Sequence, residues 1–100
     1  MNQMPFDSFV PYAFSLISVQ RNAPPLSGLY GISNAREWLL IGETDKIKAT
    51  LIDHLQGTHT PLLERGPTGF IFELCVPYNR LARQERLIQE YQPVFNRHPH

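Results

Sequence analysis

The stretch GLYGISNAREWLLIGETDKI, residues 28–47, decides the fold of this chain. Apolar and β-branched residues dominate two short runs, 28–33 and 37–41, which predicts a β-strand in each. Segment 34–36, Asn-Ala-Arg, suits a tight turn between them, because asparagine tolerates a positive φ. We therefore expect a β-hairpin whose second strand is closed by Gly42.

A helix is expected directly after this hairpin, over residues 46–55. Thr44 or Asp45 would serve as its N-cap, since both side chains can accept hydrogen bonds from the first free amides of a helix. Gly57 follows the predicted end, where a left-handed cap favours glycine. The helix would place four apolar side chains on one side: Ile47, Leu51, Ile52 and Leu55.

The rest of the chain is predicted by the same signals of periodicity and turn residues. The segments are a strand at 13–19, a loop at 21–27, a loop at 58–69 with a short helical turn at 62–65, a strand at 70–76, and a helix from 78 or 79 to about 91. The order is then β-β-β-α-β-α. This order predicts an α+β fold, in which two helices pack on an antiparallel sheet.

Composition narrows the class of protein. The chain has 100 residues, nine basic and nine acidic, so a strongly cationic nucleic-acid-binding surface is excluded, although a local basic patch is not. The single cysteine, Cys75, excludes an internal disulfide and a zinc site built from several cysteines. No apolar run is long enough to cross a membrane, and the N-terminus lacks the features of a signal peptide, so a cytoplasmic protein is expected.

The last predicted helix carries a polar residue on its apolar face. At about 100° per residue, Gln84 falls among Leu81, Leu87, Ile88 and Tyr91. Arg83, Arg86 and Glu90 point away, and Glu85 lies about a quarter turn off the apolar stripe. Gln84 is then either a core glutamine bonded to backbone or water, or a residue that borders a cleft beside the sheet.

Several short motifs, taken in order, resemble the GIY-YIG nuclease superfamily. Gly-Leu-Tyr at 28–30 and Leu-Ile-Gly at 40–42 flank the turn, and 42–47 leads into a helix as in that family. The end of the chain, with Pro93 and Asn96, resembles the family's Pro-x-x-Asn tail. The match is especially similar to the N-terminal nuclease domain of bacterial excision-repair enzymes. It implies an α+β fold, a small antiparallel sheet of about three strands flanked by helices, and hydrolysis of nucleic-acid phosphodiesters with one divalent metal ion.

This resemblance covers residues 27–97. It leaves 1–26 as an N-terminal strand with a proline-containing loop, and 98–100 as a tail. Two of the family's site residues are present: Tyr30, which in the family is proposed to help deprotonate or position the attacking water, and the tail asparagine, Asn96. His54 corresponds to a histidine found in the first helix of several subfamilies.

Three other site positions have changed. The tyrosine of the second motif is replaced by Leu40, the helix arginine that contacts the scissile phosphate by Thr50, and the metal-binding glutamate by Gln84. A neutral amide lacks the negative charge that Mg²⁺ or Mn²⁺ prefers, and threonine lacks the guanidinium that stabilises a phosphoryl group. The altered residues therefore predict an impaired or inactive nuclease, for which no cofactor is expected.

Residues elsewhere in the chain offer two ways to restore the missing chemistry. Glu85 would replace the lost carboxylate if the helix turned by about 100°, which would expose part of its apolar face. Four basic side chains are candidates for binding phosphate: Arg36, Lys46, Lys48 and Arg80.

Three hypotheses follow for the function. The first is a GIY-YIG-fold protein that has lost hydrolysis and binds DNA, RNA or a protein partner through the family's cleft. The second is an active endonuclease with a rearranged site that uses Tyr30, His54, Glu85 and Mg²⁺ or Mn²⁺. The third is a small protein-interaction domain with no nucleic-acid role, which the zero net charge mildly favours.

Overall fold

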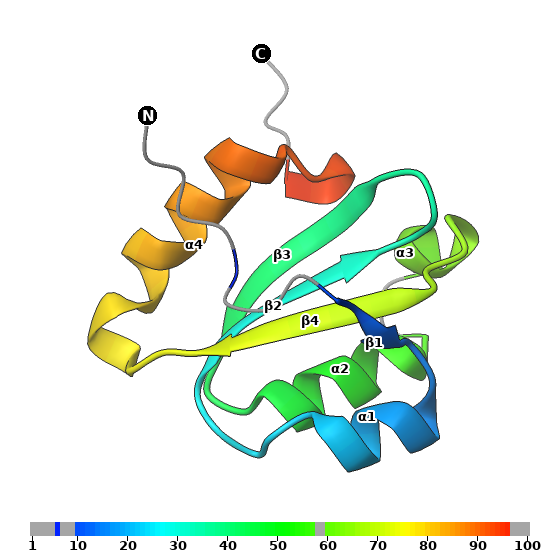
Figure 1. Cartoon of the computed structure of the whole chain (residues 1–100), viewed down its shortest axis with the longest axis horizontal. Coiled ribbons are helices and arrows are strands. Elements are labelled where there is room, and N and C mark those ends of the chain that lie inside the picture. Colours follow the sequence, from blue (N-terminus) through cyan, green and yellow to red (C-terminus); the bar gives the residue numbers. More distant parts are fainter. Residues whose placement is uncertain (1–5, 7–9, 58–59, 97–100) are drawn as a thin grey trace.

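The computed structural model describes residues 6, 10–57 and 60–96 (Figure 1). The elements in chain order are β1 (Tyr12–Ala13), α1 (Leu16–Asn22), β2 (Gly28–Ser33), β3 (Trp38–Thr44), α2 (Ile47–Leu55), α3 (Thr60–Glu64), β4 (Gly69–Leu74), α4 (Pro77–Tyr91) and the 3-10 helix η1 (Val94–Asn96). The strands form one antiparallel four-stranded sheet in the order β1-β4-β2-β3. The predicted α+β architecture, a small antiparallel sheet flanked by helices, is confirmed; the sheet has four strands, the number in the predicted element order, where the resemblance implies about three. Among the described residues, no helix is long and apolar enough to cross a membrane.

The hairpin of β2 and β3 lies at the centre of the fold. Each residue of β2 is buried, and the strand pairs with β3 on one side and β4 on the other. The predicted bounds of β2 are confirmed, but β3 runs on to Thr44, which pairs with Gly28. Asn34 adopts no positive φ; its side-chain Oδ1 instead accepts hydrogen bonds from the backbone N–H groups of Arg36 and Glu37. The turn is therefore present, but for a different reason than the one expected.

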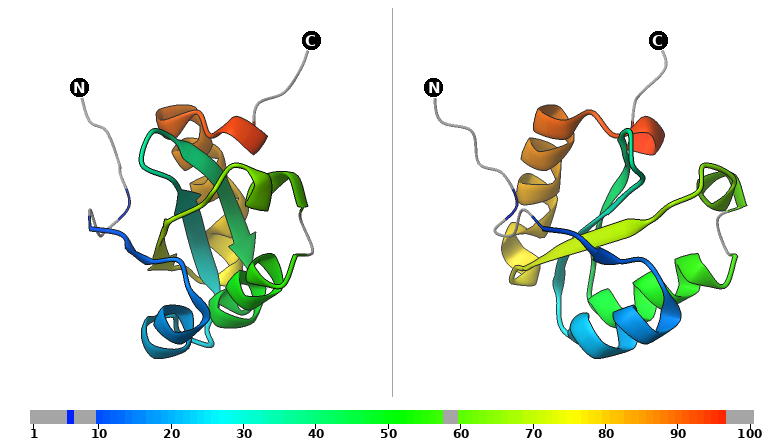
Figure 2. Two further views of the ribbon diagram at one scale, coloured as in Figure 1. Left: turned by 90° about the vertical axis from the view of Figure 1, so that its right-hand side faces the viewer. Right: turned by 45° about the vertical axis from the view of Figure 1, so that its right-hand side comes forward.

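Helices cover both faces of the sheet, as the two views of Figure 2 show. On one face, α1, α2 and α3 pack on a core that includes Tyr30, Ile32 and Phe70. On the other face, α4 packs through Leu87 on Leu29, Ile41 and Ile71. Phe6 is buried on this second face, where its ring lies near those of Trp38 and Tyr91. Because β3 is an edge strand, the end of α4 and η1 lie beside an otherwise open edge of the sheet.

The predicted strand at 13–19 is wrong. β1 holds only Tyr12 and Ala13, and α1 begins at Leu16. The side chain of Ser15 caps this helix by accepting a hydrogen bond from the Ser18 N–H at 3.3 Å. Val19 and Ala23, four residues apart, face the core, so the apolar pattern is that of a helix.

The start of α2 also differs from the prediction. Its N-cap is Lys46, not Thr44 or Asp45, and no side chain caps it. The reason is that Thr44 still pairs in β3 and Asp45 forms an ion pair with Arg80. The predicted left-handed residue after the helix is confirmed, since Gly57 has a φ of 89°.

The later elements lie close to their predicted positions. A short helix does form in the second loop, although α3 begins at Thr60 rather than at 62. The last strand, predicted at 70–76, spans Gly69–Leu74, and the last helix begins at Pro77 and ends at Tyr91. The predicted tail, 98–100, lies outside the described residues.

The face of α4 that meets the sheet is partly different from the predicted one. Leu81 is 69% exposed, so it does not belong to the apolar face. Arg83 was expected to point away, but its guanidinium forms an ion pair with the buried carboxylate of Glu73 at 2.6 Å. This arginine lies over the sheet because β4 offers a carboxylate there, which a helix pattern taken alone does not reveal.

Candidate functional site

Tyr30 lies at the centre of the candidate site. Its side chain projects from β2 and is 5% exposed. The phenolic oxygen lies 2.9 Å from Nε2 of His54, which comes from α2. The ring covers Gly42 on the neighbouring strand, where an added Cβ would overlap the end of the Tyr30 ring. The glycine therefore allows the phenol to reach across β3 to the histidine.

The environment of Tyr30 keeps its proton in place. Burial, and to a lesser extent charge repulsion from the carboxylate of Glu43, together raise the pKa of the Tyr30 phenol to about 12. At neutral pH the group is a phenol that can donate or accept a hydrogen bond. It is therefore a poor general base unless a bound group stabilises the phenolate.

This pKa makes folding sensitive to alkali. Between the unfolded value of about 10 and the folded value of about 12, only the unfolded chain loses the Tyr30 proton, so stability falls as pH rises. We expect the free energy of unfolding to drop by about 1 kcal/mol from this group between about pH 9 and about pH 11. Urea unfolding at both pH values would measure the drop. Tyr30→Phe should lack this part of the pH dependence and the exposed-tyrosine control Tyr78→Phe should keep it; equal slopes in both variants would contradict the assignment.

Two side-chain amides bind the open edge of β3. Asn96 accepts a hydrogen bond from the Ile41 N–H through Oδ1 at 2.7 Å and donates from Nδ2 to the Ile41 carbonyl at 3.0 Å. Gln84 donates from Nε2 to the same carbonyl at 3.1 Å. Gln84 is thus bonded to backbone, as the first of the two interpretations expected.

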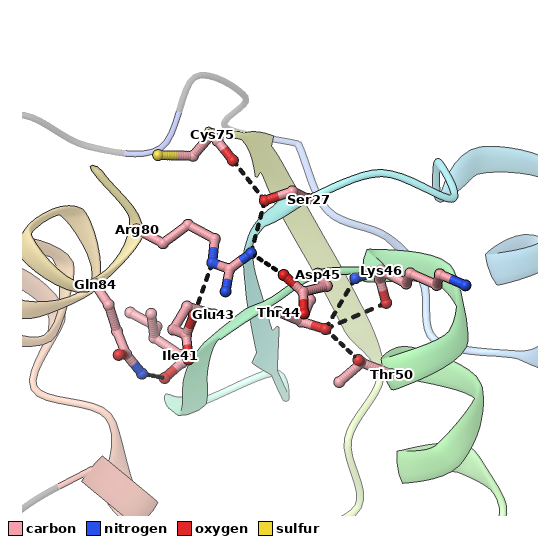
Figure 3. Close-up of polar contacts among 10 residues, drawn as sticks. All are labelled: Ser27, Ile41, Glu43, Thr44, Asp45, Lys46, Thr50, Cys75, Arg80 and Gln84. Atoms are coloured by element: carbon pink, nitrogen blue, oxygen red, sulfur yellow. Dashed lines mark hydrogen bonds and ion pairs between the residues drawn. The ribbon is translucent and has the colours of Figure 1, made fainter. Parts of the chain in front are cut away.

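A hydroxyl pair joins the end of β3 to α2 (Figure 3). The oxygens Oγ1 of Thr44 and Oγ1 of Thr50 lie 2.6 Å apart, and Thr44 also accepts from the Lys46 N–H at 3.1 Å. The side chain of Lys46 is exposed and that of Lys48 is half-buried. Four side chains contact β3 between Ile41 and Thr44, and a fifth, His54, contacts the Tyr30 hydroxyl. We call these five residues the β3-edge site: Tyr30, Thr50, His54, Gln84 and Asn96.

Arg80 forms the densest group of polar contacts near this site (Figure 3). Its Nε donates to Glu43 at 2.8 Å, and its Nη1 donates to Asp45 at 2.5 Å and to the Ser27 hydroxyl at 2.9 Å. The Ser27 hydroxyl in turn donates to the carbonyl of Cys75 at 2.8 Å. Only 14% of the Arg80 side chain is exposed. This arginine, a predicted phosphate-binding candidate, is occupied by two carboxylates.

Comparison with solved structures gives the fold its name. The N-terminal GIY-YIG endonuclease domain of UvrC from Thermotoga maritima, with bound magnesium, superposes with a TM-score of 0.68. That match covers 79% of this chain and 96% of that domain, at 16% sequence identity. A point mutant of the same domain, also bound to its catalytic divalent cation, gives a TM-score of 0.69 at 15% identity, over 80% of this chain and 96% of that one.

The chain has the GIY-YIG fold. No protein-family model and no curated protein matches the sequence. The GIY-YIG resemblance drawn from short motifs is therefore confirmed by the shape of the molecule.

The GIY-YIG fold brings together most of the residues that the motifs selected. Tyr30 meets His54, and Gln84 meets Asn96 at the same residue of β3. Thr50 lies on the side of α2 that faces the end of β3, one turn before His54. Leu40 is half-buried and packs against the same core cluster as Tyr30.

The other candidates lie farther from Ile41. Glu85 is on the exposed side of α4. Arg36 lies in the turn between β2 and β3, where it lines a shallow groove with Glu64 and Arg65. Sequence reasoning missed Glu43 and Asp45, the partners of Arg80. Their signal was weak, because acidic residues at the end of a predicted strand are ordinarily solvated.

The side chains present do not suit a divalent metal ion of the kind that the UvrC domain binds. Within residues 6, 10–57 and 60–96, no group of three or more His, Cys, Asp and Glu side chains is placed to hold a metal ion. Gln84 presents an amide N–H toward a carbonyl, and the carboxylate of Glu43 is engaged by Arg80. The donors that Mg²⁺ prefers are therefore missing or already neutralised.

Proposed function

We propose that this chain binds nucleic acid at the β3-edge site without hydrolysing it. The observation that carries the proposal is the hydrogen bond from the Gln84 amide to the Ile41 carbonyl. A side chain at the position where the GIY-YIG resemblance implies a metal-binding glutamate here holds a strand edge in place. The GIY-YIG fold supports a role with nucleic acid, because the UvrC domain that shares it is an endonuclease.

The chemistry around the site supports binding over hydrolysis. The Tyr30 phenol has a pKa of about 12 and therefore stays protonated at neutral pH. Thr50 replaces the arginine that the resemblance implies. Loss of one transition-state donor typically costs about 100- to 1,000-fold in rate. Lys46 lies just before α2 and Lys48 lies on its first turn. Both lysines provide positive charge for phosphate oxygens.

The experiment is a combined cleavage and binding assay. Labelled single- and double-stranded DNA and RNA are incubated with the whole chain in Mg²⁺, Mn²⁺ or EDTA. We expect no cutting in any condition, and a complex on native gels that forms equally well in EDTA and weakens as salt rises. The double variant Lys46→Ala, Lys48→Ala should weaken the complex. Arg21→Ala, Arg86→Ala, which removes two exposed cations from other helices, is the matched control and should not.

Two outcomes would contradict the proposal. Metal-dependent cutting that disappears in Tyr30→Phe would support the active-enzyme hypothesis, with His54 and Glu85 as the next residues to change. Absence of binding to every probe, at low salt and with a folded protein, would favour the protein-interaction hypothesis.

The protein-interaction hypothesis has an observation of its own. Five exposed apolar side chains surround the junction of β4 and α4: Leu26, Leu74, Val76, Tyr78 and Leu81. The first three line a groove of about 330 Å³, and Tyr78 is 95% exposed. Exposed apolar groups in this number are typical of contact surfaces for other proteins.

A further inference from the structure

The cation that balances the carboxylates beside the β3-edge site belongs to the protein itself. Glu43 and Asp45 flank Thr44 at the end of β3, and both accept hydrogen bonds from the guanidinium of Arg80. Arg80 stands one helical turn before Gln84 on α4. Figure 3 shows the arginine reaching from α4 between the two acidic residues.

The three groups that accept hydrogen bonds from this guanidinium all do so through oxygen atoms. They comprise two carboxylates and the Ser27 hydroxyl, which itself is held by the Cys75 carbonyl. Oxygen ligands with negative charge are the set that hard divalent cations select. Yet the guanidinium already makes three hydrogen bonds there, at 2.5, 2.8 and 2.9 Å, with 14% of its side chain exposed.

We propose that Arg80 is the resident cation of this region and excludes divalent metal ions from the Glu43–Asp45 pair. A metal ion that bridges both carboxylates through the oxygens now bonded to Arg80 would have to displace a side chain that is tethered to α4 and bonded to three partners. Displacement would also break all three of these hydrogen bonds at once, although the Asp45 side chain itself is 81% exposed. The charges of Glu43 and Asp45 are therefore balanced by Arg80, without a metal ion.

The inference is independent of nucleic-acid binding, because it concerns only how this chain responds to metal ions. It predicts that removal of the Arg80 charge creates a metal site where none exists in the wild type. Arg80→Gln keeps a hydrogen-bond donor for Glu43 and removes the charge, and Arg80→Met removes both. Arg80→Lys keeps a positive charge between the two carboxylates.

Titration with Mn²⁺, followed by calorimetry and by the electron paramagnetic resonance of free Mn²⁺, tests the prediction. Arg80→Gln and Arg80→Met should bind one Mn²⁺ about tenfold or more tightly than the wild type and Arg80→Lys do. Adding Asp45→Asn to Arg80→Gln should abolish the gain. Circular dichroism selects the variants that remain folded.

Two results would overturn the inference. A folded Arg80→Gln or Arg80→Met that binds Mn²⁺ no better than the wild type would show that the carboxylates do not form a latent site. Mn²⁺ binding by the wild type that is lost in Asp45→Asn would show that Arg80 does not exclude the metal, even if neither arginine variant folds.

Discussion

Replacement of Arg83 by leucine is expected to lower the free energy of unfolding by about 3–5 kcal/mol. Glu73 lies in β4 beneath α4, and both of its carboxylate oxygens accept from Arg83, at 2.6 and 2.7 Å. The side chains of Glu73 and Arg83 are only 10% and 15% exposed. The variant would leave a carboxylate in the interior without its cation, and that uncompensated charge is the source of the loss. Urea unfolding measures it.

A control and a second variant separate this effect from others. Arg86→Leu removes an exposed arginine one turn later in α4 and should change stability by less than about 0.5 kcal/mol. Arg83→Leu combined with Glu73→Leu should recover much of the loss, because no buried charge remains. Equal destabilisation by Arg83→Leu and Arg86→Leu would show that the ion pair is not needed for stability.

Substitution of Gly42 by alanine is expected to destabilise the fold by about 1–3 kcal/mol and to disrupt the candidate site. The new Cβ would overlap the end of the Tyr30 ring, which is enclosed between β3 and α2 and cannot move freely. The Tyr30 oxygen would then lose its 2.9 Å contact with His54. Denaturation measures the stability, and the ultraviolet absorbance of tyrosinate during an alkaline titration reports whether the Tyr30 pKa falls from about 12.

A double-mutant cycle shows whether the ring is the cause. Once Tyr30→Ala has removed the ring, adding Gly42→Ala should cost little. If Gly42→Ala destabilises both backgrounds equally, the glycine serves the backbone of β3 and not the placement of the phenol.

Much of the central fold was predictable because it is encoded by local signals. The apolar run of β2, the turn at Asn34 and the end of α4 at Tyr91 each depend on residues close together in sequence. The strand predicted at 13–19 was wrong because the prediction relied on a short apolar run alone. A short apolar run fits a strand or a buried helix, and only the Ser15 cap distinguishes them.

The candidate site was predictable in its members and not in its electrostatics. Motif positions selected Tyr30, Gln84 and Asn96, and the structure places all three beside Ile41 and Gly42. The ion pairs of Arg80 join residues 35 and 37 positions apart, so no local pattern reveals them. Whether an arginine meets phosphate or a carboxylate depends on which distant side chain the fold brings to it.

The hydrogen bonds of Asn96 and Gln84 to Ile41 have a consequence for the behaviour of the protein at high concentration. An edge strand with free N–H and C=O groups is a template on which another chain can add a strand. Here a side-chain amide occupies both groups of Ile41 in the manner of a neighbouring strand, and a second amide shares the carbonyl. Asn96 thereby protects the middle of β3 against sheet extension and self-association, at the cost of a single residue in η1.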